Sequence, residues 1–351
     1  MKILQACAYA APYEGNFMKS LYALEMHMNK CGYETIYALP ETIKHNKWVQ
    51  ELTARCKVYF LPVKKARIHP KTYFEFLRIF RENKDIKIAH SHFELYDIPI
   101  TITSPRSVKL FWHLHDPISD SYYKDNILRK SLVKFQYSVL GKKATLISCS
   151  QKHGNFVIGL GFPDKNLVYV PNGLDINRIR NSFGNNKSAD FLMYCWDFHR
   201  KGGDLAIKAA DRLTDNGFKF QLVFVPKALD YERGYIVNQN PVKDVNLLYQ
   251  NSKVFLHLSR SEGLSYALLE AIYAGLIVIC SRIPENLPVE KCPTVHFVES
   301  ENVDQIYLEM KHLLENNFEI SKEDIDFSRE YIYKNFSIDN WCDKIMKIYF
   351  N

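Results

Sequence analysis

Short apolar runs alternate with longer amphipathic stretches along almost the whole chain, and this alternation is the feature that most limits the possible folds. The apolar run at 2–9 is followed by a turn containing Pro and Gly, and then by a helical pattern that starts at Asn16 and closes at Gly32. Strands that alternate with helices in this way are typical of βαβ units and parallel sheets. The pattern therefore predicts an α/β protein and argues against an all-helical or all-strand module.

The domain organisation follows from length and from one polar segment. At about 150 residues per domain, 351 residues favour two domains. The stretch 177–190 contains turn residues and almost no apolar ones, so we expect the linker there. This predicts an amino-terminal domain over 1–176, a carboxyl-terminal domain over 191–335 and a closing helix over 336–351.

Charge is divided unevenly along the chain. The first 165 residues hold 25 basic and 14 acidic side chains, a net +11, whereas the rest hold 21 and 25, a net −4. Such a split suggests that the first half meets an anionic surface, a membrane or a phosphorylated molecule. Seven Lys or Arg lie between Lys64 and Lys84, where a helical pattern places Tyr73, Leu77 and Phe80 on one face. That helix either touches a membrane surface or is packed with its cations solvated.

Cysteine usage and hydropathy bear on the compartment. The eight cysteines are scattered without a C-x-x-C pair, and the chain opens directly into a strand-like run. No stretch approaches 18 consecutive apolar residues. We therefore expect a reduced, cytoplasmic protein without a bilayer-spanning segment, which the basic half could hold at the inner face of the cell membrane.

The segment 259–281 carries the most specific signal. A strand is expected to end near Ser259, and the loop that follows holds Glu262 and Gly263. Ser265 is placed to cap a helix that stops at Gly275. The backbone N–H groups at the start of that helix would face the carboxyl ends of the strands, where doubly wound sheets bind ligands.

This helix start is therefore a candidate seat for a diphosphate, formed by the amides of Leu264, Ser265 and Tyr266. Glu270 lies further along the same helix among apolar side chains. A carboxylate so flanked needs hydrogen-bond partners, and ribose hydroxyls could supply them.

Glu262 and Glu270 form an E-x7-E pair within "EGLSYALLEA", which is followed by an Ala-Gly stop and an apolar strand. This order resembles the signature of retaining GT-B glycosyltransferases, in particular the family 4 group (glycosyl transferases group 1) that includes bacterial polysaccharide and teichoic-acid transferases. The resemblance implies two Rossmann-like, doubly wound parallel-sheet domains with a cleft between them. It also implies transfer of a sugar, with retention, from a nucleotide-diphosphate sugar to a glycan or lipid-linked acceptor in surface polysaccharide, teichoic acid or glycoconjugate synthesis.

The segment "FHRKGGDLAIKAA" resembles the basic loop that neutralises the donor diphosphate in this family. Lys201 matches the family lysine. Trp196 stands where the family usually has an arginine, so either Arg200 takes that role or no arginine does. On this reading Lys201 and Glu262 are catalytic, with Glu262 holding sugar hydroxyls, and Arg200, Gly263, Leu264, Ser265 and Glu270 bind the donor.

Three amino-terminal segments also resemble the family. "APYEGNFMKSLYAL" resembles its glycine-containing first loop, with Gly15 near the donor phosphate, and "VPNGLD" its interdomain turn, with Asn172 at the hinge. "FWHLHDP" matches the motif in which a histidine, here His115, contacts the donor sugar near the reacting carbon, and alternation puts His113 on the same strand face. The closing helix resembles one that packs back on the first domain, with Trp341 and Ile345 in the core beside Ile348.

The resemblance implies that the donor is a substrate, that cations and amides replace a metal, and that no cofactor is needed. A catalytically inactive GT-B-like partner of another transferase is the main alternative. A Rossmann oxidoreductase would need G-x-G-x-x-G, and a P-loop nucleotidase G-K-[ST]; the sequence has neither. No RRM, helix-turn-helix or zinc pattern accompanies the basic half, so no nucleic acid partner is expected. The base pocket is expected around 240–248.

Overall fold

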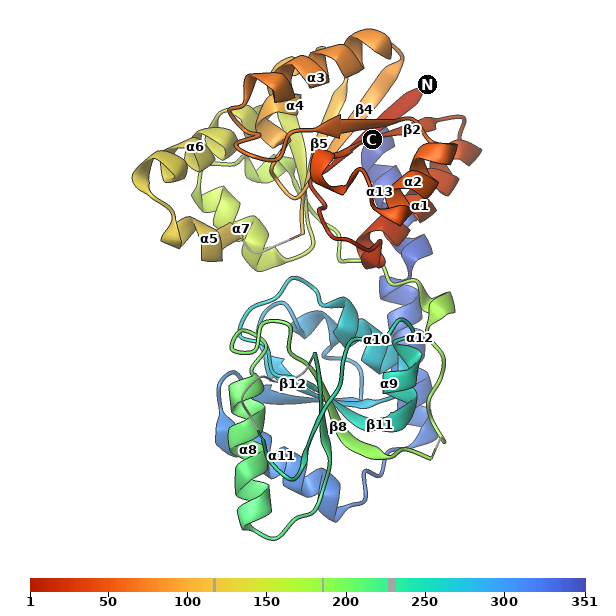
Figure 1. Cartoon of the computed structure of the whole chain (residues 1–351), viewed down its shortest axis with the longest axis vertical. Coiled ribbons are helices and arrows are strands. Elements are labelled where there is room, and N and C mark those ends of the chain that lie inside the picture. The colour runs from red at the N-terminus through yellow and green to blue at the C-terminus, as the bar shows by residue number, and fades with distance from the viewer. Residues whose placement is uncertain (116–117, 185, 227–231) are drawn as a thin grey trace. The chain divides into compact units, whose positions relative to one another are not determined.

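The computed structural model describes residues 1–115, 118–184, 186–226 and 232–351. The chain forms two compact units, one made of Met1–Gly173 together with Ile338–Asn351 and the other of Leu174–Ser337. Each unit is built on its own sheet with helices on both faces (Figure 1). The expected α/β class with two doubly wound sheets is confirmed.

The first unit contains a seven-stranded sheet in the order β3-β2-β1-β4-β5-β6-β7, and all neighbouring strands are parallel. Its strands are β1 (Lys2–Cys7), β2 (Glu34–Pro40), β3 (Val58–Leu61), β4 (Ile86–His92), β5 (Lys109–Leu114), β6 (Ala144–Ser148) and β7 (Leu167–Tyr169). The order reverses direction between β1 and β4, which is the switch point where doubly wound sheets bind ligands.

Helices cover both faces of this sheet and bury two separate cores. They are α1 (Gly15–Lys30), α2 (Lys47–Arg55), α3 (Pro70–Glu82), α4 (Asp97–Thr103), α5 (Ile118–Lys124), α6 (Ile127–Ser138), α7 (Gln151–Gly159) and α13 (Ile338–Phe350). Side chains of α1, α2 and α13 pack in one core, and those of α3, α4 and α6 in the other. Apolar residues at helical spacing explain this placement.

The second unit repeats the same plan with a six-stranded sheet in the order β10-β9-β8-β11-β12-β13, again parallel throughout. Its strands are β8 (Ala189–Tyr194), β9 (Leu222–Val225), β10 (Ile236–Asn238), β11 (Ser252–His257), β12 (Ile277–Arg282) and β13 (Val295–Glu299). The helices are α8 (Gly203–Asp215), α9 (Asn246–Asn251), α10 (Tyr266–Ala274), α11 (Val303–Glu315) and α12 (Lys322–Phe336). One face is covered by α8 and α11, the other by α9, α10 and α12.

The chain crosses between the units at Gly173–Leu174 and again at Ser337–Ile338, which differs from the expected linker at 177–190. That polar stretch belongs to the second unit, where both the amide and the hydroxyl of Ser182 donate to the carbonyl oxygen of Ala274. Its polar groups are satisfied by this packing, so low apolar content there does not mark a free linker.

The closing helix expected over 336–351 is α13, which begins at Ile338 because the extended backbone of Ser337 separates it from α12. The second of these helices, α13, is part of the first unit, with Trp341, Ile345 and Tyr349 buried in its core. Ile348, which we expected there, is only half-buried beside them. No helix of the described chain is long and apolar enough to cross a membrane.

The helix α3 also differs from the pattern drawn from the sequence. Phe76, Ile79 and Phe80 form its buried face, whereas Leu77 is 49% exposed. Phe74 is 69% exposed. The helix is therefore packed on one side and presents two large apolar side chains to solvent on the other.

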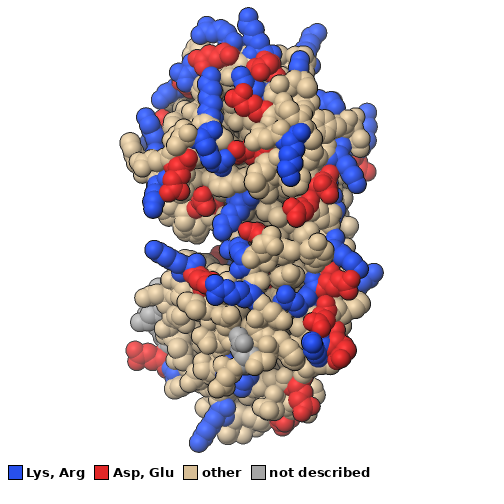
Figure 2. All heavy atoms as spheres, turned by 90° about the vertical axis from the view of Figure 1, so that its right-hand side faces the viewer, with Lys and Arg blue, Asp and Glu red and all other residues tan. Residues whose placement is uncertain are grey.

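The charge imbalance coincides with the units. Residues 338–351 add two basic and two acidic side chains to the first unit, so its excess stays at +11 and that of the second unit at −4. Figure 2 shows lysine and arginine side chains spread over the visible face of the first unit. The basic surface is thus a property of one folded unit.

Candidate functional site

Four polar side chains meet beyond the carboxyl end of β11, and we refer to them as the glutamate cluster: Lys201, Arg200, Ser259 and Glu262. The Ser259 hydroxyl donates to Glu262 Oε1 at 2.7 Å, and the Lys201 ammonium donates to the same oxygen. Arg200 Nη1 lies 3.4 Å from Glu262 Oε2. Glu262 is buried, so both of its carboxylate oxygens are held by protein donors.

A tight loop brings the two cations to Glu262. Gly202 has a φ of 80° and caps the start of α8. A Cβ at this position would lie 2.2 Å from the carbonyl oxygen of Leu258, so only glycine allows the loop to pass so close to the end of β11. The close approach explains why Gly202 follows Lys201 directly.

Arg260 fixes the same loop from the other side. Its guanidinium donates to both carboxylate oxygens of Asp204, at 2.8 and 2.9 Å, and to the carbonyl oxygen of His199. Its amide donates to the carbonyl oxygen of Arg200 at 2.9 Å. A two-point contact of this kind restricts the loop to one arrangement. Arg260 is therefore a positioning residue that the sequence analysis missed.

The electrostatics of the glutamate cluster favour the ionised carboxylate. Burial acts to raise the pKa of Glu262, but Lys201 and the Ser259 hydroxyl outweigh it, and the pKa lies below its ordinary value. Burial lowers the pKa of the neighbouring His257 to about 4, so this imidazole is neutral at pH 7. At neutral pH the cluster thus holds a fixed anion with cations already in place.

Glu270 occupies a second polar site in the same unit. Arg178 donates to Glu270 Oε1, and the Tyr249 hydroxyl donates to Oε2 at 2.8 Å. Asn246 holds this arrangement by donating to the carbonyl oxygen of Arg178 at 2.8 Å. The partners that a buried Glu270 requires therefore come from the protein. Asn246 lies in 240–248, so the segment expected to hold the base is tied to Glu270.

The start of α10 has the geometry expected at a strand-to-helix turn. Ser265 is the N-cap residue but makes no side-chain capping hydrogen bond, and Gly275 ends the helix in the left-handed conformation with a φ of 84°. Gly263 and Leu264 lie in the loop between the glutamate cluster and Ser265. The second unit thus contains five of the predicted donor-binding residues: Arg200, Gly263, Leu264, Ser265 and Glu270.

The first unit contains a cluster of imidazoles at the carboxyl ends of β4 and β5. We refer to His90, His92, His113 and His115 as the histidine cluster. The rings of His113 and His115 stack with centroids 4.0 Å apart, consistent with their shared strand face. His115 Nε2 shares a hydrogen bond of 3.0 Å with His92 Nδ1. Asp116, the second residue of the expected motif, lies outside the described residues.

Burial keeps the histidine cluster neutral. It lowers the pKa of His115 to about 3 and that of His90, His92 and His113 well below the ordinary value. His115 can therefore donate one hydrogen bond and accept another at pH 7, but it carries no charge.

The remaining expected site residues, Gly15 and Asn172, also lie in the first unit. Gly15 has a φ of 59°, and a Cβ there would meet the Tyr9 hydroxyl at 2.5 Å. Asn172 is buried next to Gly173, where a Cβ would collide with Trp341 at 2.5 Å. Gly15 and Gly173 thus meet backbone requirements, and neither Gly15 nor Asn172 belongs to the unit that holds Glu262.

Sequence reasoning missed several partners of these residues. Ser259 stands at the strand end quoted for the motif, so its role was accessible from position alone. Arg178 and Tyr249 reach Glu270 across 92 and 21 residues, and no local pattern marks either of them. Motifs thus identify the predicted site residues more readily than the residues that hold them in place.

Two protein-family models match the chain. The model described as "Glycosyl transferases group 1" matches residues 175–332, which contain the glutamate cluster. The model described as "Glycosyltransferase Family 4" matches residues 20–178, which contain the histidine cluster. Together the two matches cover most of both units.

Two curated relatives align over much of the chain. The phosphatidylinositol N-acetylglucosaminyltransferase gpi3 subunit of Schizosaccharomyces pombe is 24% identical over 307 residues, covering 79% of this chain and 66% of that protein. The capsular polysaccharide biosynthesis glycosyltransferase CapH of Staphylococcus aureus is 25% identical over 253 residues, covering 67% of this chain and 69% of that protein. The chain thus spans just under two thirds of the length of the first relative.

Solved structures share the fold over nearly the whole chain. A glycosyltransferase from Rickettsia africae superposes with a TM-score of 0.77 at 14% identity, covering 99% of this chain and 97% of that one. Anabaena Alr3699/HepE in complex with UDP and glucose gives 0.77 at 13% identity, covering 99% of each. Fold and site together define a glycosyltransferase of the GT-B fold. Within that class, the two family models identify the chain as a family 4-like member of glycosyl transferases group 1.

Proposed function

We propose that this glycosyltransferase moves a hexosyl or related sugar, with retention, from a nucleotide-diphosphate sugar to a glycan or lipid-linked acceptor at the inner face of a membrane. The observation that carries the proposal is the glutamate cluster, in which a buried carboxylate and two cations meet at the carboxyl end of a parallel strand. Anabaena Alr3699/HepE has been solved in complex with UDP and glucose and with UDP-glucose, which supports a donor of the same class.

The cations of the glutamate cluster are suited to a diphosphate. Lys201 and Arg200 are already ordered by Glu262, so binding a donor would not have to immobilise two free side chains. Donor phosphates would compete with Glu262 for these cations. The Glu262 carboxylate would then accept hydrogen bonds from sugar hydroxyls while it keeps its hydrogen bond from Ser259. Negative charge that develops on the leaving diphosphate would be stabilised by Lys201 and by the amides at the start of α10. We therefore propose a donor site that uses no metal.

Glu270 is proposed to bind the ribose of the donor. Arg178 and the Tyr249 hydroxyl donate to different carboxylate oxygens of Glu270, and a carboxylate oxygen can accept more than one hydrogen bond. Arg178 and Tyr249 would keep the carboxylate oriented while a ribose hydroxyl is added. In this proposal Glu270→Gln raises KM for the donor several-fold and changes kcat little, because the contact is made equally in substrate and transition state.

A cavity in the first unit is proposed to hold the acceptor. It has a volume of about 880 Å³, and its lining includes Lys65, Arg67, Ile68 and Arg129. Arg67 is paired with Glu94 at 2.6 Å and Arg129 with Asp125 at 3.2 Å, and Lys65 adds a further positive charge at the same cavity. Apolar walls with cations at the rim suit an acceptor that combines a hydrocarbon chain with a phosphate.

Exposed apolar side chains lie next to this cavity and support a lipid-linked acceptor. Ile127 and Leu128, at the start of α6, are each 80% exposed, and Leu128 also lines the cavity. Phe74 on α3 adds a further exposed ring, although Arg78 of α3 is paired with Glu75 and Glu82 of the same helix and Lys71 with Glu41. We propose that α6, more than α3, contacts the membrane surface.

The first experiment is a panel of UDP-, GDP- and ADP-sugars scored for donor hydrolysis and for transfer to lipid extract. We expect turnover with one nucleotide class, loss of turnover in Glu262→Ala, and a product whose anomeric configuration matches that of the donor. Added Mg²⁺ or Mn²⁺ should not raise the rate. If the wild type binds none of the donors, the chain is instead an inactive partner of another transferase.

The membrane proposal is tested with liposomes of neutral and anionic composition. Co-sedimentation should rise with anionic lipid and fall in Ile127→Ser/Leu128→Ser, because a basic surface and an apolar anchor act together. Phe74→Ser serves as the matched exposed substitution on α3, which we expect to have the smaller effect. Equal binding to neutral and anionic vesicles would contradict the proposal.

A further inference from the structure

Two histidines of the histidine cluster carry ring nitrogens that have no use in the proposed reaction. Neither nitrogen of His113 has a hydrogen-bond partner within the described ranges, and Nε2 of His90 lacks one as well. His90 and His113 are 0% and 1% exposed. A buried polar atom without a partner costs about 1–3 kcal/mol, so three such nitrogens in one place indicate that a ligand belongs there.

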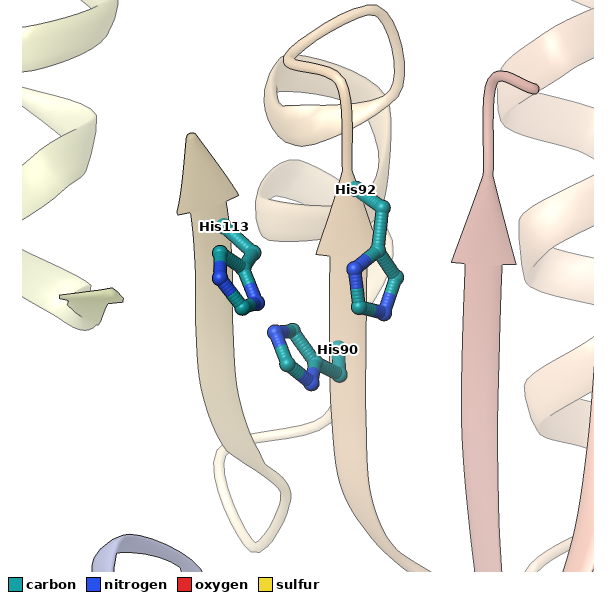
Figure 3. Close-up of side chains that lie close together, drawn as sticks. All are labelled: His90, His92 and His113. Carbon is teal, nitrogen blue, oxygen red and sulfur yellow. The ribbon is translucent and has the colours of Figure 1, made fainter. Parts of the chain in front are cut away.

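The strands place a third histidine beside these two. His90 and His92 alternate onto the same face of β4, and the register pairs His92 with His113 on β5. Figure 3 shows the three rings gathered in one space over these strands. Each ring offers one nitrogen, and the three nitrogens lie within 4.8 Å of one another.

This spacing is close to that of a metal centre. Zinc binds imidazole nitrogen at about 2.0–2.1 Å, so two ligands of a tetrahedral ion lie about 3.4 Å apart. Side-chain rotations that move each ring by about an ångström would close the present arrangement onto an ion. The rings of His90 and His113 already lie parallel, 2° apart, with centroids separated by 5.3 Å.

The hydrogen bonds around the cluster select the nitrogens that would bind. The side-chain oxygen of Gln5 accepts from Nε2 of His92 at 2.9 Å, which leaves the Nδ1 lone pair of His92 facing inward. The Tyr349 hydroxyl contacts Nδ1 of His90 at 2.6 Å, which leaves Nε2 of His90 as the nitrogen that can bind an ion. Metal-binding histidines are oriented by hydrogen bonds of this kind on the opposite nitrogen.

We propose that His90, His92 and His113 form a binding site for a divalent transition metal of the Zn²⁺ type. Three neutral imidazoles are the ligand set of a zinc site that keeps its fourth position open. His115 Nε2, 3.0 Å from Nδ1 of His92, is positioned to be the fourth ligand or to face that position. Binding would break the hydrogen bond between these two rings, so the metal would also change the setting of His115.

The metal would occupy the first unit, whereas the proposed donor site lies in the second. Its binding therefore does not depend on the proposed function, and a failed donor screen leaves it intact. At neutral pH no proton has to leave the cluster, because burial already keeps the imidazoles unprotonated.

The test uses the full chain stripped with a chelator and titrated with Zn²⁺ by calorimetry and with Co²⁺ by visible absorption. We expect one ion per chain, with the strong absorption of tetrahedral Co²⁺ and no thiolate charge-transfer band. His113→Ala should weaken binding by at least about 100-fold, and Tyr349→Phe by about 10-fold, in the range measured when an orienting partner is lost.

His153→Gln is the matched control, because it removes another buried histidine of the first unit outside the cluster, and it should bind Zn²⁺ as the wild type does. If the wild type takes up no stoichiometric metal, water fills the cluster and the proposal is overturned. Wild-type affinity in His113→Ala, or a thiolate band with Co²⁺, would place the ion elsewhere and overturn it as well. The wild-type titration decides the question even where a variant does not fold.

Discussion

The two units place polar clusters at corresponding points of the same fold, yet the clusters differ in charge. In each sheet, the switch point lies between the first strand of the unit and its neighbour on the other side. These pairs are β1 and β4 in the first unit, and β8 and β11 in the second. At the end of β4 stands the histidine cluster, neutral and with unpaired nitrogens. Beyond β11 stands the glutamate cluster, ionised and fully paired.

This difference shows that the fold provides the location and the side chains provide the chemistry. The glutamate cluster is stabilised by pairing, so its members depend on one another. The histidine cluster is kept neutral by burial, so it depends on the closed packing of α13 and β1 around it. Acid, substitution of a partner and backbone strain should therefore affect the two units differently.

Acidification should unfold the first unit before the second. Burial lowers the pKa of the four clustered histidines, so below about pH 6.5 the unfolded chain binds protons that the folded chain excludes. The stability of the first unit therefore decreases as the pH is lowered. Asp97 acts in the opposite sense, because burial raises its pKa to about 7 and the folded unit takes up that proton. A net of roughly three protons lowers the unfolding free energy by about 4 kcal/mol per pH unit.

Tryptophan fluorescence can follow this transition, because Trp48, Trp112 and Trp341 are buried in the first unit and Trp196 is exposed in the second. In the described part of the second unit, His257 is the histidine whose pKa is lowered, to about 4, and Glu262 loses its stabilising ionisation only as pH falls through its own lowered pKa. Hydrogen exchange should therefore show the second unit protected at a pH where the fluorescence has already shifted. Loss of both signals at one pH would contradict the comparison.

Lys201→Ala should lower kcat with the accepted donor by about 10²–10³-fold, because in the proposed reaction it removes the fixed cation that stabilises charge on the leaving group. In the same variant, Arg200 is the one cation of the glutamate cluster that still contacts Glu262, and its contact is the weaker of the two. Lys208→Ala, exposed on α8, is the matched control and should keep wild-type kcat. The measurement is steady-state turnover, and a change confined to KM would rule out this role for Lys201.

Gly202→Ala should destabilise the second unit by about 3 kcal/mol, combining left-handed strain with a collision against Leu258. Gly217→Ala separates the two effects, because Gly217 has a similar φ of 82° and nothing within 4 Å of its Cβ position. We expect about 1 kcal/mol for Gly217→Ala. Urea unfolding measures both, and equal losses would show that the loop tolerates the contact with Leu258.

Removal of either of two tyrosine hydroxyls should have a smaller effect than Gly202→Ala. Tyr349→Phe removes the partner of both His90 and Gln5, and we expect it to lower the stability of the first unit by about 2 kcal/mol. Tyr249→Phe removes one hydrogen-bond donor to Glu270 and should lower the stability of the second unit by about 1 kcal/mol. Urea unfolding, followed by tryptophan emission for Tyr349→Phe and by hydrogen exchange for Tyr249→Phe, tests the order. The reverse order would mean that Glu270 depends more on the Tyr249 hydroxyl than His90 and Gln5 depend on the Tyr349 hydroxyl.

Much of the fold could be predicted because the signals are local. Strand β4 and helix α1 follow from apolar runs and helical spacing within a few residues. The domain boundary could not be placed in the same way. The segment 177–190 is polar, but the contact between Ser182 and Ala274 spans 92 residues and leaves no trace in the local composition.

The candidate site divides along the same line. Lys201, Glu262 and Glu270 stand in motifs, so the sequence marked them although Lys201 and Glu262 are 61 residues apart. Tyr349 and Gln5, 344 residues apart, stand in no motif and meet only because α13 returns to the first sheet. The grouping of three histidines at metal-binding distance likewise depends on strand register, which single strands do not specify.

The return of α13 to the first unit has a consequence for how the chain is made. Residues 1–173 leave the ribosome first, but their unit lacks Trp341 and Tyr349 until the entire second unit has been synthesised. The second unit is continuous in sequence and can fold as soon as Ser337 emerges. The first unit is thus begun before the second and completed after it, and its apolar sheet face must be shielded in the interval.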